Sequence, residues 1–190
     1  PPRSTLFPYT TLFRSIVSGN TNNAFSLNSS TGQIIVANSA ALNYEVTSSY
    51  ALLVRVTDNG AGNLWSQATI TINILNINEP PVISNQAFSV AQNLPNGTLV
   101  GTVQASDPDQ GQILTFSITG GNTNSCFAIN ASTGAITVAN SGALTPQTFN
   151  LTVRATDKGS PILYTQATVS ITVTSVNQAP VINHQSFRTA

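Results

Sequence analysis

Hydrophobic and polar residues alternate along several segments of the chain, and the clearest case lies near its end. Val169, Ile171 and Val173 fall on one side of an extended chain, while the serine and threonine residues between them fall on the other. Residues 70–74 repeat this pattern with three isoleucines. The alternation is typical of antiparallel strands with one face on a hydrophobic core, and no segment shows a helical period. The pattern therefore predicts an all-β chain.

The sequence also repeats itself after about one hundred residues. The stretch IVSGNTNNAFSLNSSTGQIIVANSAAL, starting at Ile16, returns from Ile118 as ITGGNTNSCFAINASTGAITVANSGAL. Further on, NINEPPVI from Asn76 returns as SVNQAPVI from Ser175. A unit of this length suits one small sandwich with its own core. We therefore expect tandem seven-stranded Greek-key β-sandwiches of the immunoglobulin-like kind, with no helix longer than one turn in residues 81–177.

The repeat divides the chain into four parts. Residues 16–79 form the C-terminal part of a truncated repeat, residues 80–179 form a complete repeat, and residues 180–190 open a third one. Residues 1–15, PPRSTLFPYTTLFRS, resemble a translated sequencing adapter, and we interpret them as an artefact outside the natural fold. Leu12 to Ser15 nevertheless align with Leu114 to Ser117. They are therefore the residues that we expect to imitate a missing strand.

Within each repeat, a glycine that follows Ser-Thr marks a hairpin between two short strands. This glycine is Gly32 in the first repeat and Gly134 in the second. A residue without Cβ can adopt a positive φ at such a turn. We therefore expect both glycines to do so.

Acidic residues are few and fall at selected places. Only 6% of the chain is charged, against about a quarter in a typical globular domain. The chain has six carboxylates, which are Glu45, Asp58, Glu79, Asp107, Asp109 and Asp157. Carboxylates this sparse and this clustered are poorly explained as a solvated surface, and they indicate metal ligands.

The complete repeat resembles a cadherin repeat of the bacterial kind, and the resemblance covers residues 16–190. Asp107 and Asp109 in ASDPDQG match the acidic pair that ends the second strand of this family. LNYE matches the Leu-Asp-x-Glu signature, with Asn43 in the place of Asp and Glu45 retained. Together these motifs imply the cadherin fold.

Two further motifs complete the resemblance. Asp58 in VTDNG and Asp157 in ATDKG match the single Asp after the sixth strand. Residues 76–79, Asn-Ile-Asn-Glu, stand where the family has its acidic interdomain linker. Singly these motifs are weak, and their common order and spacing make the resemblance specific.

The resemblance implies a calcium site at the junction of the first two repeats. Ca²⁺ takes six to eight oxygen ligands, which no single strand end supplies. The implied ligands are Glu45, Asn76, Asn78, Glu79, Asp107, Asp109 and Asp157, with Asn43 and Asp58 as weaker candidates. Carboxylates this close repel one another until a cation neutralises them, so calcium is expected to stiffen the junction. The second junction has Gln92, Gln147, Ser175 and Gln178 in the acidic places and is expected to be metal-poor.

The function implied by the resemblance is that of a calcium-binding structural or adhesion module. Such a module rigidifies a multi-repeat protein outside the cell or on its surface, where homophilic cell adhesion is one role. Its partners are the neighbouring repeats of the same chain. Two alternatives stay open, which are a module that binds another cell-surface protein or a glycan, and a non-catalytic appendage of a secreted enzyme.

Several other functions are disfavoured by the composition. Six basic and six acidic residues give a net charge near zero, which argues against a nucleic-acid partner. No apolar run approaches the roughly eighteen residues of a membrane span. His184, the single histidine, lies in the terminal stub, so we expect no catalytic triad and no enzyme. We expect Cys126 to be a small semi-buried side chain, and Trp65, aligned near Tyr164, to have a packing role, with a sugar contact as its alternative.

Overall fold

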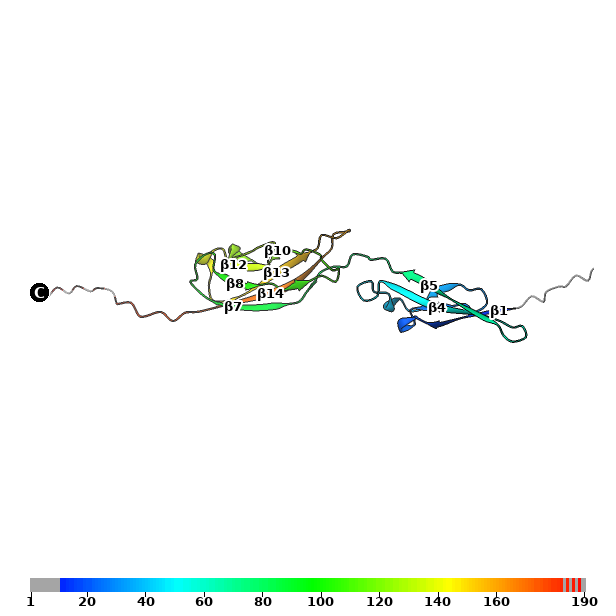
Figure 1. Ribbon diagram of the computed structural model, residues 1–190. Helices are drawn as coiled ribbons and strands as arrows, with labels where there is room; N and C mark the ends of the chain where they lie inside the picture. The colour runs from blue at the N-terminus through cyan, green and yellow to red at the C-terminus, as the bar shows by residue number, and fades with distance from the viewer. Residues whose placement is uncertain (1–10, 183, 185, 187, 189–190) are drawn as a thin grey trace, which may run out of the picture. The chain divides into compact units, whose positions relative to one another are not determined.

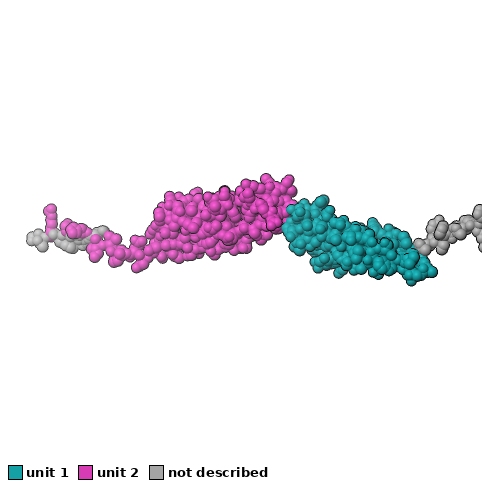
Figure 2. All heavy atoms as spheres, viewed as in Figure 1, with its two compact units in different colours: residues 1–77 teal, residues 78–190 magenta. Residues whose placement is uncertain are grey.

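A computed structural model describes residues 11–182, 184, 186 and 188 of the chain (Figure 1). Its regular elements are β-strands and 3₁₀ helices of three residues each. The chain divides into two compact units, which are unit 1, Pro1–Ile77, and unit 2, Asn78–Ala190 (Figure 2). The all-β prediction is therefore confirmed.

Unit 2 is a sandwich with a four-stranded sheet on one side and shorter sheets on the other. The four-stranded sheet has the order β10-β13-β14-β7, in which only β7 and β14 run parallel. A second sheet has the order β11-β12-β8, and β6 pairs with β9. Because β6 leads into β7 and β8 into β9 after short breaks, these nine segments make seven strands, as the sequence predicts. The strands are β6 (Val82–Ile83), β7 (Gln86–Ala91), β8 (Leu99–Thr102), β9 (Ala105–Ser106), β10 (Thr115–Gly120), β11 (Phe127–Ile129), β12 (Ala135–Val138), β13 (Thr148–Thr156) and β14 (Tyr164–Thr174), with 3₁₀ turns at η3 (Thr123–Ser125) and η4 (Ser141–Ala143).

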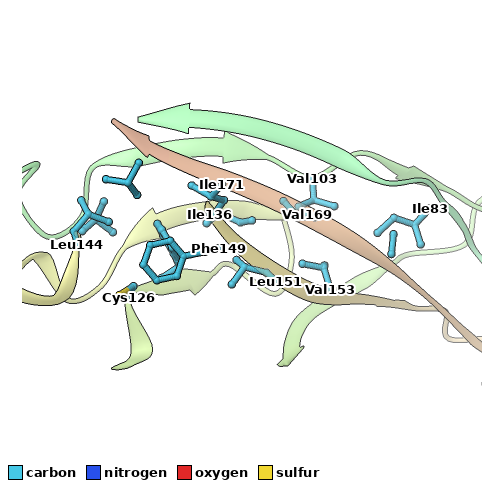
Figure 3. Packing of buried hydrophobic residues seen from close by; sticks show 14 of the residues in the cluster. Ile83, Val103, Cys126, Ile136, Leu144, Phe149, Leu151, Val153, Val169 and Ile171 are labelled. Atoms are coloured by element: carbon cyan, nitrogen blue, oxygen red, sulfur yellow. The ribbon is translucent and has the colours of Figure 1, made fainter. Parts of the chain in front are cut away.

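The core of unit 2 is filled from both sheets (Figure 3). Leu151 of β13 and Ile171 of β14 meet Ile136 of β12, and all three are fully buried. Phe127 and Phe149 pack edge to face, with ring centroids 5.2 Å apart. The inward positions predicted in the last strand are buried as expected, since alternate residues of a strand share one face.

Unit 1 contains the C-terminal strands of the same sandwich. One sheet has the order β1-β4-β5, and β2 pairs with β3. Its elements are β1 (Leu12–Ser18), η1 (Thr21–Asn23), β2 (Phe25–Leu27), β3 (Ile34–Val36), η2 (Ser39–Ala41), β4 (Ser49–Asp58) and β5 (Trp65–Asn73). Within the described part of unit 1, no strand takes the places that β6 to β9 have in unit 2.

Residues Leu12 to Ser15 do form part of a strand, which confirms their expected strand role. Leu12 lies opposite Asp58, and Ser15 lies opposite Arg55. The matched residue Ser117 of unit 2 lies opposite Arg154 in the same register. The extended backbone of this segment is thus enough to cover the free edge of β4, whatever the origin of its sequence.

The core of unit 1 is small because the second layer is incomplete in the described part of this unit. Phe25, Tyr50 and Leu52 are buried, and the two rings pack edge to face at 5.1 Å. Ile70, which the alternation places on the inward side, is 38% exposed, whereas the matched Val169 in unit 2 is fully buried. The alternation predicts the face of Ile70 correctly, but not its burial, because burial also needs a strand on the opposite side.

The two hairpin glycines have the conformation expected from the sequence. Gly32 has φ of +80° and Gly134 has φ of +72°. A Cβ atom at Gly134 would also lie 2.8 Å from the carbonyl oxygen of Val103. Both the backbone angle and the lack of space therefore require glycine here.

Candidate functional site

Asp157 occupies the loop between β13 and β14 at one end of unit 2. Its Oδ1 accepts hydrogen bonds from the backbone N–H of Leu163, at 2.8 Å, and of Gly159, at 3.2 Å. Its own N–H donates to the carbonyl oxygen of Leu163 at 3.1 Å. Asp157 is only 2% exposed, and these hydrogen bonds fix the orientation of its carboxylate.

Asn78, at the start of unit 2, binds the second oxygen of the same carboxylate. Its Nδ2 donates to Oδ2 of Asp157 at 2.8 Å and to the carbonyl oxygen of Pro161 at 2.9 Å. Its Oδ1 accepts from Nε2 of Gln112 at 3.0 Å. A Cβ atom at position 159 would overlap Oδ1 of Asn78, so the glycine makes room for this side chain. Asn78 therefore connects the start of the unit to two of its loops.

Asp107 and Asp109 lie in the loop between β9 and β10. Oδ1 of Asp107 accepts from the N–H of Asp109 at 3.0 Å. Oδ2 of Asp109 accepts from the N–H of Glu79 at 2.9 Å. A carboxylate oxygen of Glu79 also lies within 4.8 Å of one of Asp109. This loop therefore brings a third acidic side chain, that of Glu79, to the pair predicted from the sequence.

The pKa values of two of these carboxyls shift in opposite directions. Burial raises the pKa of Asp107, and the negative charges of Asp109 and Asp157 add to the rise, against a hydrogen bond from the Asp109 N–H. Oδ2 of Asp107 is buried and accepts no hydrogen bond from any described residue. Burial would also raise the pKa of Asp157, but hydrogen bonds from Leu163, Asn78 and Gly159 outweigh it and lower that pKa. Both oxygens of Asp157 thus accept hydrogen bonds from the protein, whereas Oδ2 of Asp107 has no donor among the described residues.

These five predicted residues, Asn78, Glu79, Asp107, Asp109 and Asp157, come together within unit 2 through hydrogen bonds and mutual charge effects. Sequence reasoning missed Gln112, which holds Asn78. Its position in the same loop as Asp109 is the signal that could have found it. Its amide hydrogen-bonds across to residues far away in the sequence, and no local motif reports such a contact.

The remaining predicted ligands belong to unit 1. Oδ1 of Asp58 accepts from the N–H groups of Gly60 and Leu64, at 3.1 and 3.0 Å, in a loop like that of Asp157. Oδ1 of Asn43 accepts from the N–H of Val46 at 2.8 Å within a turn. Participation of Glu45 and Asn76 in a site with unit 2 stays a prediction, as does the metal-poor second junction.

Two aromatic residues outside this site carry an arginine over the ring. The guanidinium of Arg55 lies 4.6 Å from the ring centroid of Trp65, and that of Arg154 lies 4.2 Å from the ring of Tyr164. Trp65 is 59% exposed and Tyr164 is 55% exposed. Core packing therefore does not describe either ring, and sequence reasoning missed the arginines beside them.

The remaining residues singled out from the sequence add no further site. Cys126 is fully buried, deeper than predicted, and its thiol hydrogen-bonds to the carbonyl oxygen of Ala143 at 3.3 Å. Burial raises the pKa of this thiol, which keeps it protonated and unreactive. His184 is exposed. In the described part of the chain, no helix has the length and apolar character to cross a membrane.

Comparison with known proteins gives consistent matches. The family model described as "Cadherin domain" matches residues 7–75 and 86–174. The first range begins inside residues 1–15, whose adapter origin stays a prediction. Human Protocadherin Fat 1 is 34% identical over 91% of this chain, and human Protocadherin Fat 4 is 39% identical over 85%. The chain spans only 4% and 3% of the lengths of these two relatives.

Solved structures give the same result. A crystal structure of mouse Cadherin-23 EC22-24 has a TM-score of 0.68 and 30% identity, covering 87% of this chain and 53% of its own. Domains 3–6 of Protocadherin Gamma B2 have a TM-score of 0.67 and 26% identity, covering 86% of this chain and 41% of their own. The tandem sandwich is therefore one shared with multi-repeat extracellular cadherin domains of known structure.

Proposed function

This chain belongs to the cadherin domain family, and we propose that it is a calcium-binding structural and adhesion module that rigidifies an extracellular multi-repeat protein. The observation that carries the proposal is the buried Oδ2 of Asp107, which accepts no hydrogen bond within the described residues. Burial raises the pKa of Asp107, and the charges of Asp109 and Asp157 in the same cluster add to the rise. A cation supplies the missing positive charge.

The donors in this cluster fit calcium better than a softer metal. They are carboxylate and amide oxygens, which Ca²⁺ prefers, and neither histidine nor cysteine contributes. Asp107, Asp109 and Glu79 are placed by the hydrogen bonds described above. Calcium bound there neutralises the repulsion between them.

Asp157 and Asn78 have a more constrained part in the proposed site. Both Asp157 oxygens already accept hydrogen bonds, and Oδ1 of Asn78 already accepts from Gln112. Binding through Oδ1 of Asn78 requires Gln112 to move away. We therefore propose that Asn78 orients Asp157 in the absence of metal and becomes a ligand only when calcium draws its oxygen away from Gln112.

The full ligand set extends to unit 1. We propose that Glu45 and Asn76 complete the coordination, with Asn43 and Asp58 as weaker contributors. Calcium takes six to eight oxygens, and several oxygens of the cluster in unit 2 already accept hydrogen bonds. Calcium then links consecutive repeats through shared ligands. Neighbouring repeats are the first partners in this proposal, homophilic contacts at a cell surface are a further role, and no catalysis is involved.

Isothermal titration calorimetry of the whole chain in chelator-treated buffer tests the proposal. We expect saturable calcium binding with a dissociation constant of about 10⁻⁴ to 10⁻³ M, typical of extracellular modules. Magnesium should bind more weakly, because it demands a rigid octahedral site. No heat of binding for calcium, or equal binding by both ions, would count against the proposal.

A second function is favoured by the arginine-aromatic pairs. Each unit presents one such pair at matched positions, with Trp65 beside Thr57 and Tyr164 beside Thr156 in the neighbouring strands. An exposed ring with a guanidinium fork can contact a sugar ring and a carboxylate together. This arrangement suits the glycan-binding alternative, with an acidic sugar as ligand.

Trp65 is the single tryptophan, so its fluorescence reports this second function directly. Titration with an acidic oligosaccharide should change the emission, and Arg55→Ala should weaken the effect. Arg14→Ala serves as a control for loss of an arginine in the same unit, because Arg14 donates to the carbonyl oxygen of Ser30. If a neutral oligosaccharide changed the Trp65 emission to the same extent, Arg55 would not be binding a sugar carboxylate. Among the described residues, we find no feature that specifically favours the enzyme appendage.

A further inference from the structure

Gln112 joins two loops of unit 2 that are distant in the sequence. Its backbone N–H donates to the carbonyl oxygen of Asp109 at 3.3 Å, which holds it in the loop between β9 and β10. Its side chain reaches the loop between β13 and β14, where Oε1 accepts from the N–H of Lys158 at 3.4 Å. Its Nε2 donates to Oδ1 of Asn78 at 3.0 Å. One side chain therefore connects the acidic loop, the β13–β14 loop and the start of the unit.

The orientation of the Asn78 amide is fixed by the protein. Its Nδ2 donates to Oδ2 of Asp157 and to the carbonyl oxygen of Pro161. These two bonds determine which way the amide faces, so that Oδ1 lies towards Gln112. The amide also packs against Gly159, where a Cβ atom would overlap it. Little room is therefore left around Oδ1 for the Gln112 amide and a cation at the same time.

The Gln112 amide offers this oxygen a substitute for a cation. An amide NH₂ group carries partial positive charge on its hydrogens and can only donate. Oδ1 of Asn78 belongs to the proposed calcium ligands, so the N–H group and a bound cation repel each other at the same atom. This repulsion is stronger in a partly buried site than in water. The bond between Gln112 and Asn78 therefore opposes cation binding and stabilises the loops when the cation is absent.

We propose that Gln112 is an internal competitor for the cation, which holds Asn78 in the calcium-free state and thereby lowers the affinity for calcium. This inference rests on the proposed calcium site. In the calcium-free state the Gln112 bond keeps the loops around Asp157 in place, and in the calcium-bound state Gln112 is released from Asn78. Gln112 thus helps to set the calcium concentration at which the repeat becomes loaded, without being a ligand itself.

Thiol labelling of Cys126 in chelator tests the calcium-free half of the proposal. Cys126 is fully buried in unit 2, so a reagent reaches it only when the unit opens. Gln112→Ala should speed the labelling by about threefold to tenfold, as expected for the loss of one hydrogen bond. Gln110→Ala removes an exposed glutamine from the same loop and is the matched control, which should label at the rate of the unmodified chain. Equal rates for the two variants would overturn the proposal.

Calorimetric titration of the whole chain with calcium tests the competition. Gln112→Ala should bind calcium about threefold to tenfold more tightly, because the variant loses a bond only in the calcium-free state. Gln112→Glu keeps Oε1 for the N–H of Lys158 but replaces the donor by a charged acceptor. It should therefore bind calcium more tightly still, because added ligand charge raises the affinity of a calcium site. Gln110→Ala should bind as the unmodified chain does.

The direction of the change in affinity separates competition from other roles of Gln112. If Gln112 were a ligand, or only a support for the loop, Gln112→Ala would weaken calcium binding. Weaker or unchanged binding by this variant would therefore overturn the proposal and leave the calcium site itself in place. No calcium binding by the unmodified chain would overturn both the competition and the proposed function.

Discussion

Units 1 and 2 share the same local structures although, among the residues that the structure describes, only those of unit 2 form a complete core. In both units an asparagine holds a turn before a buried phenylalanine: Asn20 bonds twice to Phe25, and Asn122 bonds twice to Phe127. The turns contain matching positive φ angles, 54° at Asn22 and 55° at Asn124. These turns therefore follow from the local sequence and need no second layer.

The core behaves differently. Ile72 and Ile171 are the same residue at matched positions, yet Ile171 is fully buried and Ile72 is only partly buried. The difference comes from the strands on the opposite side, which lie far away in the sequence. The comparison teaches that turns are encoded locally in this repeat, whereas burial depends on the whole sandwich.

The largest effect should come from the core of unit 2. We expect Ile171→Ala to lower the unfolding free energy of unit 2 by about 2–5 kcal/mol, because it leaves a cavity in a closed core. Ile72→Ala in unit 1 should cost less than half as much. Denaturant titrations can follow each unit separately, with Trp65 fluorescence for unit 1 and Cys126 thiol labelling for unit 2. An equal loss of unfolding free energy in the two variants would mean that Ile72 is as well buried in solution as Ile171.

The second-largest effect should come from calcium, through the ligands in unit 2. At a hundred times its dissociation constant, calcium that binds only the folded state stabilises by about 2.7 kcal/mol. Asp109→Ala should remove most of that gain, because it deletes a predicted ligand beside Glu79. Gln147→Ala, at the predicted metal-poor junction, should leave the gain intact. Differential scanning calorimetry with and without chelator measures both, and identical curves for the unmodified chain would refute the calcium site.

A smaller effect should follow from the asparagine that distinguishes the two aspartate loops. Both aspartates accept from the backbone of their own loops, and Asp157 accepts in addition from Nδ2 of Asn78. The pKa of Asp157 is lowered in the folded state, so its contribution to stability is present above the ordinary Asp pKa and is lost as the pH falls through the lowered value. Asn78→Ala should therefore destabilise unit 2 at neutral pH and progressively less in acid.

Thiol labelling of Cys126 across a pH series measures this difference. Asn59→Ala, next to Asp58 in unit 1, is the matched control and should leave the labelling of unit 2 unchanged. A penalty for Asn78→Ala that stayed constant down to strong acid would show that its bond to Asp157 is not the cause.

The smallest effect should come from Asp107. Its folded-state pKa is raised, chiefly by burial, so its charge opposes folding and the penalty grows as the pH rises through that raised value. Without calcium, Asp107→Asn should increase the stability of unit 2 by less than about 1 kcal/mol at neutral pH, since solvent screens much of the repulsion. With calcium the same variant should be less stable than the unmodified chain. Melting curves in chelator and in calcium would reveal this change of sign, and its absence would remove Asp107 from the ligand set.

Most of the fold could be predicted from the sequence because the signals were local. Alternation placed Val169 and Ile171 on one face, and the repeat aligned Leu12 to Ser15 with a strand whose register the structure reproduces. The acidic pair and the Asp157 loop were found from short motifs. Gln112 and the arginine beside Trp65 were not, because their contacts join separate loops or strands. The exposure of Ile70 was missed because it depends on strands absent from the described part of unit 1.

Gly159 links two distant parts of the repeat, because its lack of a side chain leaves room for Asn78. A methyl group at this position would displace the Asn78 side chain, so the glycine and the leading asparagine must be inherited as a pair. Gly60 stands at the same place in unit 1, two residues after Asp58. Repeats that carry this glycine can be duplicated or exchanged as whole cassettes, with the leading segment and the loop remaining compatible at each new position.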